Sequence, residues 1–269
     1  MRIREVCDRI AAYHPAPAQA HGTTCDGYKW GDPEAECTGV AVSITASVDV
    51  VREAAARGCN LIVVHEPSFY SHEDDTDWLA GRHAPFDEKR ALLDRHGIAI
   101  WRDHDGIHAA RPDGIFLYAA KELGWEAFMA EGNEMNWAFK LPPTTVGAVA
   151  RHFKERCGLH GIRVIGDLDA PVSTVAFIAH AMFGPMARKQ VEDALRYDVV
   201  IPGETLDWTL PNYLRDAVQL GICKAGIFAG HFSFEELGMR RAVDWLRPLV
   251  GPDLKVESIP AGDMFTAVL

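Results

Sequence analysis

The order strand, helix, strand occurs twice along the chain, and this order restricts the fold more than any other feature of the sequence. Each copy has a β-rich segment, then a segment with apolar residues at helical spacing, then a short apolar run. The segments are residues 39–45, 48–57 and 60–64 in the first copy and residues 174–179, 185–196 and 198–204 in the second. A continuous apolar run is typical of a strand covered on both faces, so we expect parallel sheets with helices against them.

Each copy is followed by one more predicted helix and strand. These segments are residues 87–97 and 98–101 after the first copy, and residues 211–221 and 222–229 after the second. We expect helices to continue through residues 109–123 and 236–247, and a loop at residues 23–36.

The segment between the two copies predicts a strand, a turn at Pro142 and Pro143, and a helix that begins near Thr144 or Thr145. The sequence therefore predicts an α/β fold of two pseudo-repeated lobes. We place the lobes at residues 1–125 and 126–269, with the boundary between residues 125 and 172.

Metal-capable side chains stand at the ends of the predicted strands in both copies. His65 and Glu66 directly follow the apolar run at residues 60–64, and Glu204 ends the corresponding run of the second copy. In open α/β sheets, ligands collect at the carboxyl ends of parallel strands. We therefore expect a metal site at these strand ends, between the lobes.

Two further pairs of side chains have the spacing of neighbours on a helix. His104 and His108 follow the next predicted strand of the first copy, and His231 and Glu235 follow that of the second. Residues four apart lie on one helix face, so each pair can hold one ion. Imidazole and carboxylate donors without thiolates favour Zn, Mn or Fe, and more than three donors favour two ions. The alternative is a structural α/β protein whose histidines form only hydrogen bonds in loops.

Four short motifs resemble those of the Nif-three-like family of hexameric dinuclear-metal proteins, often labelled GTP cyclohydrolase 1 type 2. That family has a strand ending in His-His-Pro, then His-Thr-Asn-x-Asp, Thr-Gly-Glu and a late Gly-His-x-x-x-Glu. The matching segments here are residues 65–67, 104–108, 202–204 and 230–235. The resemblance implies a homohexamer and two divalent transition-metal ions. It implies His65, Glu66, His108, His231 and Glu235 as ligands, with His104 and Glu204 as hydrogen-bonding partners of the ligands or as acid/base groups.

The chain departs from this pattern at two of the ligand positions. Glu66 stands where the family has its second histidine, and His108 stands where it has an aspartate. Nitrogen and oxygen donors are thus exchanged between two positions, while their total stays similar. Residues 180–185 replace a glycine-rich loop of the family, and we expect His180 to form a wall of the substrate pocket. His72 and the acids after it are expected to be a solvated loop.

Composition excludes several classes of partner. A net charge of -11 and a pI near 5.5 argue against nucleic-acid binding, and no segment approaches the apolar length of a membrane helix. The six cysteines are scattered without a C-x-x-C pair, which fits reduced thiols and a cytoplasmic location.

Two functions agree with these features. The first is a metal-dependent hydrolase in which activated water attacks a small substrate, either a nucleotide, as the cyclohydrolase label suggests, or another heterocycle. The second is a non-catalytic metal-binding or metal-handling assembly that docks partner proteins.

Overall fold

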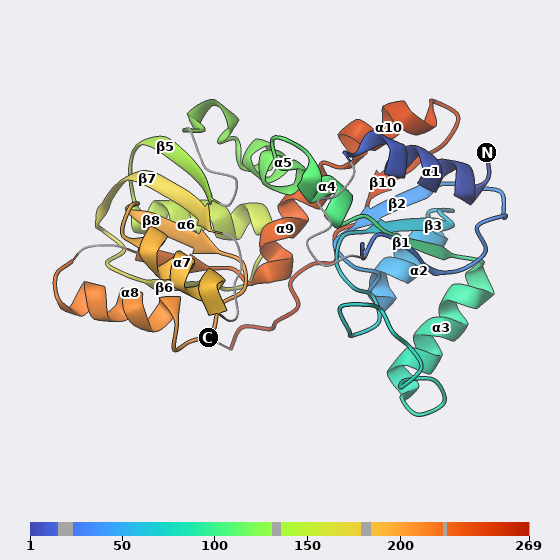
Figure 1. Cartoon of the computed structure of the whole chain (residues 1–269), viewed down its shortest axis with the longest axis horizontal. Helices are drawn as coiled ribbons and strands as arrows, with labels where there is room; N and C mark the ends of the chain where they lie inside the picture. Colours follow the sequence, from blue (N-terminus) through green and yellow to red (C-terminus); the bar gives the residue numbers. More distant parts are fainter. Residues whose placement is uncertain (16–23, 131–135, 179–183, 223–224, 269) are drawn as a thin grey trace. The chain divides into compact units, whose positions relative to one another are not determined.

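The chain folds into two compact units, each with its own five-stranded sheet (Figure 1). The computed structural model describes residues 1–15, 24–130, 136–178, 184–222 and 225–268. Unit 1 consists of residues 1–118 and 238–261, and unit 2 of residues 119–237 and 262–269. The expected lobes place residues 238–261 in the second half, whereas the structure includes them in unit 1. The reason is a late strand, Val256–Ser258, which joins the first sheet beside residues 40–42.

The sheet of unit 1 has the strand order β1-β4-β3-β2-β10. Its strands are β1 (Gly27–Trp30), β2 (Val40–Ser43), β3 (Leu61–Val64), β4 (Ala99–Arg102) and β10 (Val256–Ser258). The pairs β10–β2, β2–β3 and β3–β4 are parallel, and β1 lies antiparallel to β4 at the edge. The carboxyl ends of β2, β3 and β4 therefore meet at one edge of the sheet, as the sequence predicts.

Helices cover both faces of this sheet. Figure 1 shows α1 and α10 on one side of it and α2 and α3 on the other. The helices of this unit are α1 (Ile3–Tyr13), α2 (Val48–Ala56), α3 (Ala84–His96), α4 (Asp105–Ala109) and α10 (Val243–Val250). The Ser47 hydroxyl accepts a hydrogen bond from the Val50 N–H and caps α2, and Gly97 ends α3 in the left-handed conformation. Side chains of β2, β3 and β4 pack with those of α2 and α3 in a buried apolar core.

Unit 2 repeats the parallel three-strand arrangement, with the strand order β5-β7-β8-β9-β6. Its strands are β5 (Asn136–Thr145), β6 (Arg163–Ile165), β7 (Pro171–Ile178), β8 (Val199–Pro202) and β9 (Ala225–Phe228). The strands β7, β8 and β9 are parallel, and β5 and β6 are antiparallel edges. This matches β2, β3 and β4 of unit 1, which confirms the two pseudo-repeated α/β lobes.

Two groups of side chains stabilise unit 2. One is an aromatic cluster that includes Phe139, Phe153, Phe177 and Phe234, and the other packs β7 and β8 against α7 and α8. The helices are α6 (Val146–Cys157), α7 (Gly184–Ala194) and α8 (Leu210–Gln219), with a short 3-10 turn, η1, at Glu126–Phe128. The helices α5 (Gly114–Leu123) and α9 (His231–Arg240) contain two of the three points at which the chain passes between the units, and the third follows residue 261.

Several sequence expectations about local structure are wrong. The helix expected through residues 109–123 is interrupted around Pro112, because proline lacks the N–H that a helix interior needs. The helix expected through 236–247 is likewise divided into α9 and α10. The turn expected at Pro142 and Pro143 lies within β5, where the register shifts, since an edge strand tolerates proline. The loop expected at 23–36 contains β1.

Among the described residues, no helix has both the length and the apolar character required to cross a bilayer.

Candidate metal centre

The end of β3 holds His65 and Glu66 in a fixed position. The backbone N–H groups of both residues donate to the Ile44 carbonyl at the end of β2, over 3.2 and 2.7 Å. His65 is fully buried, and Glu66 is 6% exposed. The two residues are therefore held by backbone hydrogen bonds directly beyond the end of the sheet, with their side chains buried.

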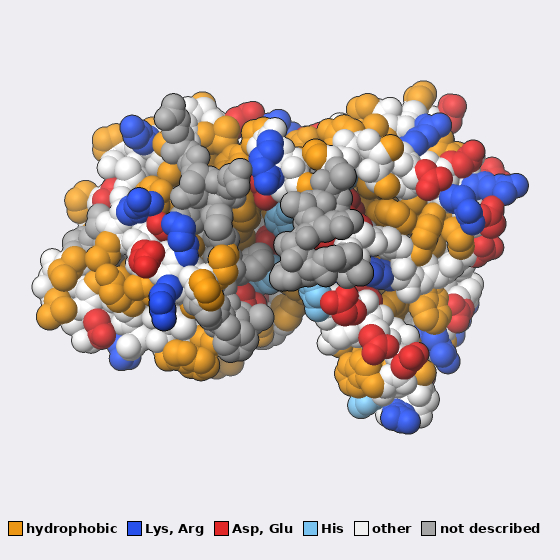
Figure 2. Space-filling model, in the orientation of Figure 1, with side chains coloured by type: hydrophobic (Ala, Val, Ile, Leu, Met, Phe, Trp, Pro, Cys, Tyr) orange, Lys and Arg blue, Asp and Glu red, His pale blue; other side chains and the backbone are white. Residues whose placement is uncertain are grey.

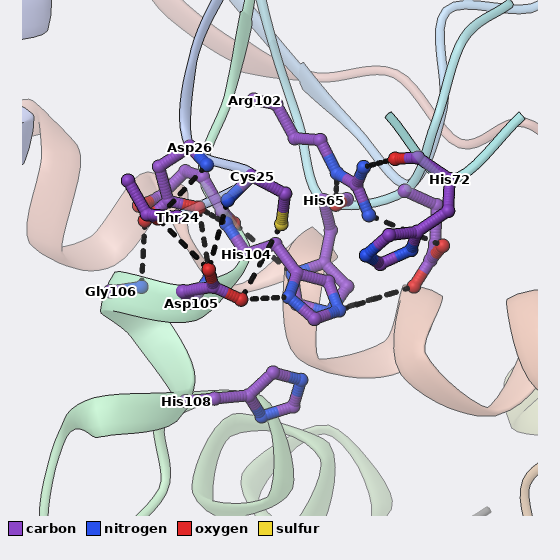
Figure 3. A network of polar contacts seen from close by, with 12 residues as sticks. Thr24, Cys25, Asp26, His65, His72, Arg102, His104, Asp105, Gly106 and His108 are labelled. Carbon is purple, nitrogen blue, oxygen red and sulfur yellow. Dashed lines mark hydrogen bonds and ion pairs between the residues drawn. The ribbon is translucent and has the colours of Figure 1, made fainter. Parts of the chain in front are cut away.

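The end of β4 is held by a carboxylate that precedes β1. Asp26 accepts hydrogen bonds from the N–H groups of His104, Asp105 and Gly106 over 2.6, 2.8 and 2.7 Å (Figure 3). These residues are the N-cap, His104, and the first two residues of the short helix α4, and such N–H groups have no partner within the helix. Asp26 thus fixes the backbone from which His104 and His108 extend.

His104, at the N-cap of α4, and His108, within that helix, lie beside His65 in one cluster of three imidazoles. The ring centroids are 4.5 Å apart for His65 and His104, 4.9 Å for His65 and His108, and 5.0 Å for His104 and His108. One ligand atom from each of the three residues lies within 4.8 Å of the other two. This arrangement fits a single metal ion bound by three histidines.

Each of the three rings has its Nδ1 atom next to an oxygen that only accepts hydrogen bonds. The acceptors are the Asp103 carbonyl for His65 at 3.1 Å, the Asp105 carboxylate for His104 at 2.9 Å and the Asp113 carboxylate for His108 at 2.8 Å. An acceptor at Nδ1 places the proton on that nitrogen and the lone pair on Nε2. Metal-binding histidines in proteins have this type of partner, so the donor set fits a metal ion.

Burial sets the charge state of the cluster. Burial and, to a smaller extent, the neighbouring His65 and His108 lower the pKa of His104 to about 3, so the ring is neutral near pH 7. Burial raises the pKa of Asp105, but hydrogen bonds from His104, Cys25 and Thr24 outweigh this and hold it well below its usual range. A neutral ring beside an ionised carboxylate is the form in which histidine binds metals.

Glu66 lies between this cluster and a buried arginine. One carboxylate oxygen is 3.7 Å from His104 Nε2 and 4.0 Å from His65 Nε2, and the other is 3.9 Å from Arg102 Nη2. Arg102 is fully buried at the end of β4 and donates to the carbonyls of His65 and His72. No sequence pattern pointed to Arg102, because an arginine in a strand shows its partners only after folding.

Unit 2 carries a second group of donors at its corresponding strand ends. Gly230 has a φ of +87° and turns the chain from β9 into α9, which begins at His231. His231 Nε2 is 2.9 Å from the carboxylate of Glu235, a fully buried residue. The Nδ1 atom of His231 is 3.8 Å from the carboxylate of Glu204, whose side chain is 48% exposed.

The structure thus places the predicted site residues in two groups, one in each unit. Unit 1 holds His65, Glu66, His104 and His108, and unit 2 holds Glu204, His231 and Glu235. The roles assigned to individual residues remain predictions.

Three further residues bear on the predicted site. The side chain of His72 is 67% exposed and its backbone carbonyl binds Arg102. His180 lies outside the described residues. Cys25 lies beside His104, but burial raises the pKa of its thiol to about 12, which disfavours a thiolate ligand.

The fold is that of an α/β protein with two related units, and its described residues include histidine and carboxylate groups that could hold a metal ion. The sequence model of the Duf34/NIF3 (NGG1p interacting factor 3) family matches residues 1–261. The chain therefore belongs to the Duf34/NIF3 family.

Similar proteins agree with this membership. A protein of Clostridium acetobutylicum named GTP cyclohydrolase 1 type 2 homolog is 23% identical over 248 residues, which are 87% of this chain and 85% of that protein. The crystal structure of a hypothetical protein from Staphylococcus aureus has a TM-score of 0.73 at 17% identity, covering 100% of this chain and 99% of that one. A Bacillus cereus protein related to NIF3 has a TM-score of 0.71 at 15% identity, with the same coverage. At such identities, the structural matches show the fold alone.

Proposed function

We propose that the protein binds two divalent transition-metal ions, Zn, Mn or Fe, and hydrolyses a small substrate. The observation that carries the proposal is the cluster of three imidazoles whose Nδ1 atoms all face fixed acceptors. The ligands proposed from the family resemblance are His65, Glu66 and His108 of unit 1, and His231 and Glu235 of unit 2.

A bound divalent ion would supply one chemical effect, which is to lower the pKa of a water molecule so that hydroxide is available near neutral pH. The chain would supply proton transfer. Glu204 is suited to accept a proton, since its side chain is half exposed and lies 3.8 Å from His231. His104 is less suited to this role, because its Nδ1 atom is held by Asp105 and its ring is packed among other imidazoles.

The proposed substrate is a small heterocycle with an anionic group, such as a nucleotide. A pocket of about 480 Å³ in unit 2 is lined by Arg163, Arg215 and Phe228, among others. This volume is in the range of small-molecule sites, and arginine and aromatic side chains suit a phosphate and a ring. Phe228 ends the strand that leads to His231. The name of the Clostridium relative, a GTP cyclohydrolase 1 type 2 homolog, supports the same class.

The function is tested by measuring metal content and activity on the same preparations. Native protein never exposed to chelator should contain two ions per chain by mass spectrometry and should hydrolyse at least one substrate in a screen of nucleotides, cyclic amides and esters. A His65→Ala/His231→Ala variant should lose both properties. Protein without stoichiometric transition metal, or activity that survives in the variant, would refute the proposal. Bound metal without any hydrolysis would instead favour the metal-binding assembly.

We also propose that the protein forms a homohexamer in the cytoplasm. Hydrophobic side chains gather over α8 in unit 2 (Figure 2). Trp208, which precedes this helix, and Leu220 and Ile222, which follow it, are 72%, 75% and 49% exposed. Exposed apolar groups of this size are typical of surfaces that bind another protein. Light scattering coupled to gel filtration should give six times the 29.7-kDa chain mass, and a monomeric mass would contradict the proposal.

A further inference from the structure

We infer that unit 1 binds one metal ion by itself through His65, His104 and His108, with His104 as a direct ligand. The inference rests on the proposed metal-binding function and deepens it. The family resemblance gives His104 a supporting or acid/base role, whereas the geometry of this chain places it on equal terms with the other two histidines.

His104 is oriented in the same way as its two neighbours. Its Nδ1 faces the Asp105 carboxylate at 2.9 Å, as the Nδ1 of His108 faces the Asp113 carboxylate at 2.8 Å. The Nε2 atoms of His104 and His65 are 3.7 and 4.0 Å from the same oxygen of Glu66, so both nitrogens point to the same side of the cluster. His104 thus has the two features that qualify His65 and His108 as ligands, an acceptor at Nδ1 and an Nε2 atom available to an ion.

The ring of His104 is also held more firmly than a loop histidine would be. Asp105 accepts hydrogen bonds from the Thr24 hydroxyl at 2.9 Å and the Cys25 N–H at 3.0 Å, which fix its carboxylate beside the ring (Figure 3). The Asp26 carboxylate holds the backbone N–H of His104 itself. Preorganised orientation of this kind is the role that carboxylates perform behind metal-binding histidines. Asp105 is therefore a positioning residue for His104.

The three donors are a sufficient protein ligand set within one unit. Catalytic zinc sites commonly have three protein ligands and keep one position open for water or substrate. All three histidines belong to unit 1, at the ends of the neighbouring strands β3 and β4. The ion bound there should therefore persist when the donors of unit 2 are removed.

The exchange at residue 108 explains why this chain has such a set. The family pattern has an aspartate four residues after the histidine, and this chain has a second imidazole, His108, which comes within 5.0 Å of the His104 ring. An aspartate also occupies position 105, where the family pattern has a threonine, and it holds the His104 ring. The two substitutions together supply a third imidazole, His108, and a carboxylate, Asp105, that orients the His104 ring.

The test counts ions in the intact chain by mass spectrometry and compares two histidine variants. His104→Gln should lower the metal content from two ions per chain to one. The matched control is His72→Gln, which changes an exposed histidine whose ring centroid is 6.5 Å from His104, and it should keep two ions. Asp105→Asn should stay folded, retain the same ligands and weaken the binding of one ion about 10- to 100-fold.

A spectroscopic measurement separates a ligand from a hydrogen-bonding neighbour. In a His231→Gln background loaded with one equivalent of Cu²⁺, electron spin-echo modulation should show three coupled imidazoles, and two after His104→Gln is added. Two coupled imidazoles in both proteins, or a His104→Gln variant that keeps two ions, would overturn the inference while leaving the proposed function intact. Wild-type protein without metal would refute the proposed function itself. If His104→Gln does not fold, unchanged affinity in folded Asp105→Asn would overturn the inference, and weakened affinity would support it.

Discussion

Replacing Arg102 by methionine should selectively destabilise the sheet that carries the histidine cluster. Arg102 is fully buried, donates to the carbonyls of His65 and His72, and lies 3.9 Å from the Glu66 carboxylate. Removing one member of a buried ion pair costs about 3–5 kcal/mol, because the other charge stays buried without its counter-ion. The cost of the lost hydrogen bonds to the two carbonyls is partly included in that figure. We therefore expect the free energy of unfolding of unit 1 to fall by about 4 kcal/mol.

The assay is native-state hydrogen exchange of peptides from β3 and β4 in metal-free protein, because two units need not unfold in one transition. Arg102→Lys keeps the charge but not the planar arrangement of donors. Its opening free energy should therefore lie between those of the methionine variant and the wild type. The control is Arg52→Met, which removes an exposed arginine of the same unit. Equal opening free energies in the Arg102→Met and Arg52→Met variants would show that the buried contacts contribute nothing, and the reasoning would fail.

Three further predictions follow from other groups. Burial lowers the pKa of Lys89 to about 8 from 10.5, so between these values the unfolded chain binds more protons than the folded one and stability rises with pH. Relative to Lys89→Met, wild-type unit 1 should therefore gain about 2 kcal/mol between pH 7 and about pH 9.5 in hydrogen exchange, and a flat difference would contradict this. Burial raises the pKa of Asp198, but hydrogen bonds from Ser173 and Thr174 outweigh this and lower the pKa from 3.8 to about 2. The ionised carboxylate therefore stabilises the folded state fully above pH 3.8, and this contribution is lost as the pH falls through 2. Asp198→Asn should lower the free energy of unfolding of unit 2 by about 1 kcal/mol at pH 7 after allowance for solvent screening, and hydrogen exchange should show this cost shrinking towards zero as the pH falls through 2. Gly230→Ala, at a φ of +87°, should reduce the metal content, whereas Gly221→Ala, with similar strain at +73°, should leave it unchanged in mass spectrometry.

The parallel strands could be predicted because strands buried on both faces have continuous apolar sequences. The runs that became β3 and β8 are continuous and apolar, and all four residues of each strand are buried. The strands β1, β6 and β10 were missed, since each has only three or four residues and lies at a sheet edge with partly exposed side chains. Their pairing depends on partners far along the chain, which local patterns do not show.

The candidate site was predictable in its donors and not in the groups that hold them. His65, His104 and His231 follow strands, and this placement can be read from sequence. Asp26 and Asp113 looked like ordinary loop acids, because their carboxylates gain their partners only when separate segments meet. Asp105 lies one residue after His104, and Asp113 lies five residues after His108. Such spacings are only a weak indication in the sequence that a carboxylate will bond to a histidine ring.

The late strand β10 has a consequence for how the protein is made. It pairs with β2, so the first sheet is complete only after residues 256–258 have left the ribosome. Unit 2 lies almost entirely within residues 119–237 and can fold earlier, during translation. Throughout that interval the outer edge of β2 lacks its neighbour, and an open strand edge invites pairing with other nascent chains. Biosynthesis therefore leaves this strand edge of unit 1 open until residues 256–258 have emerged.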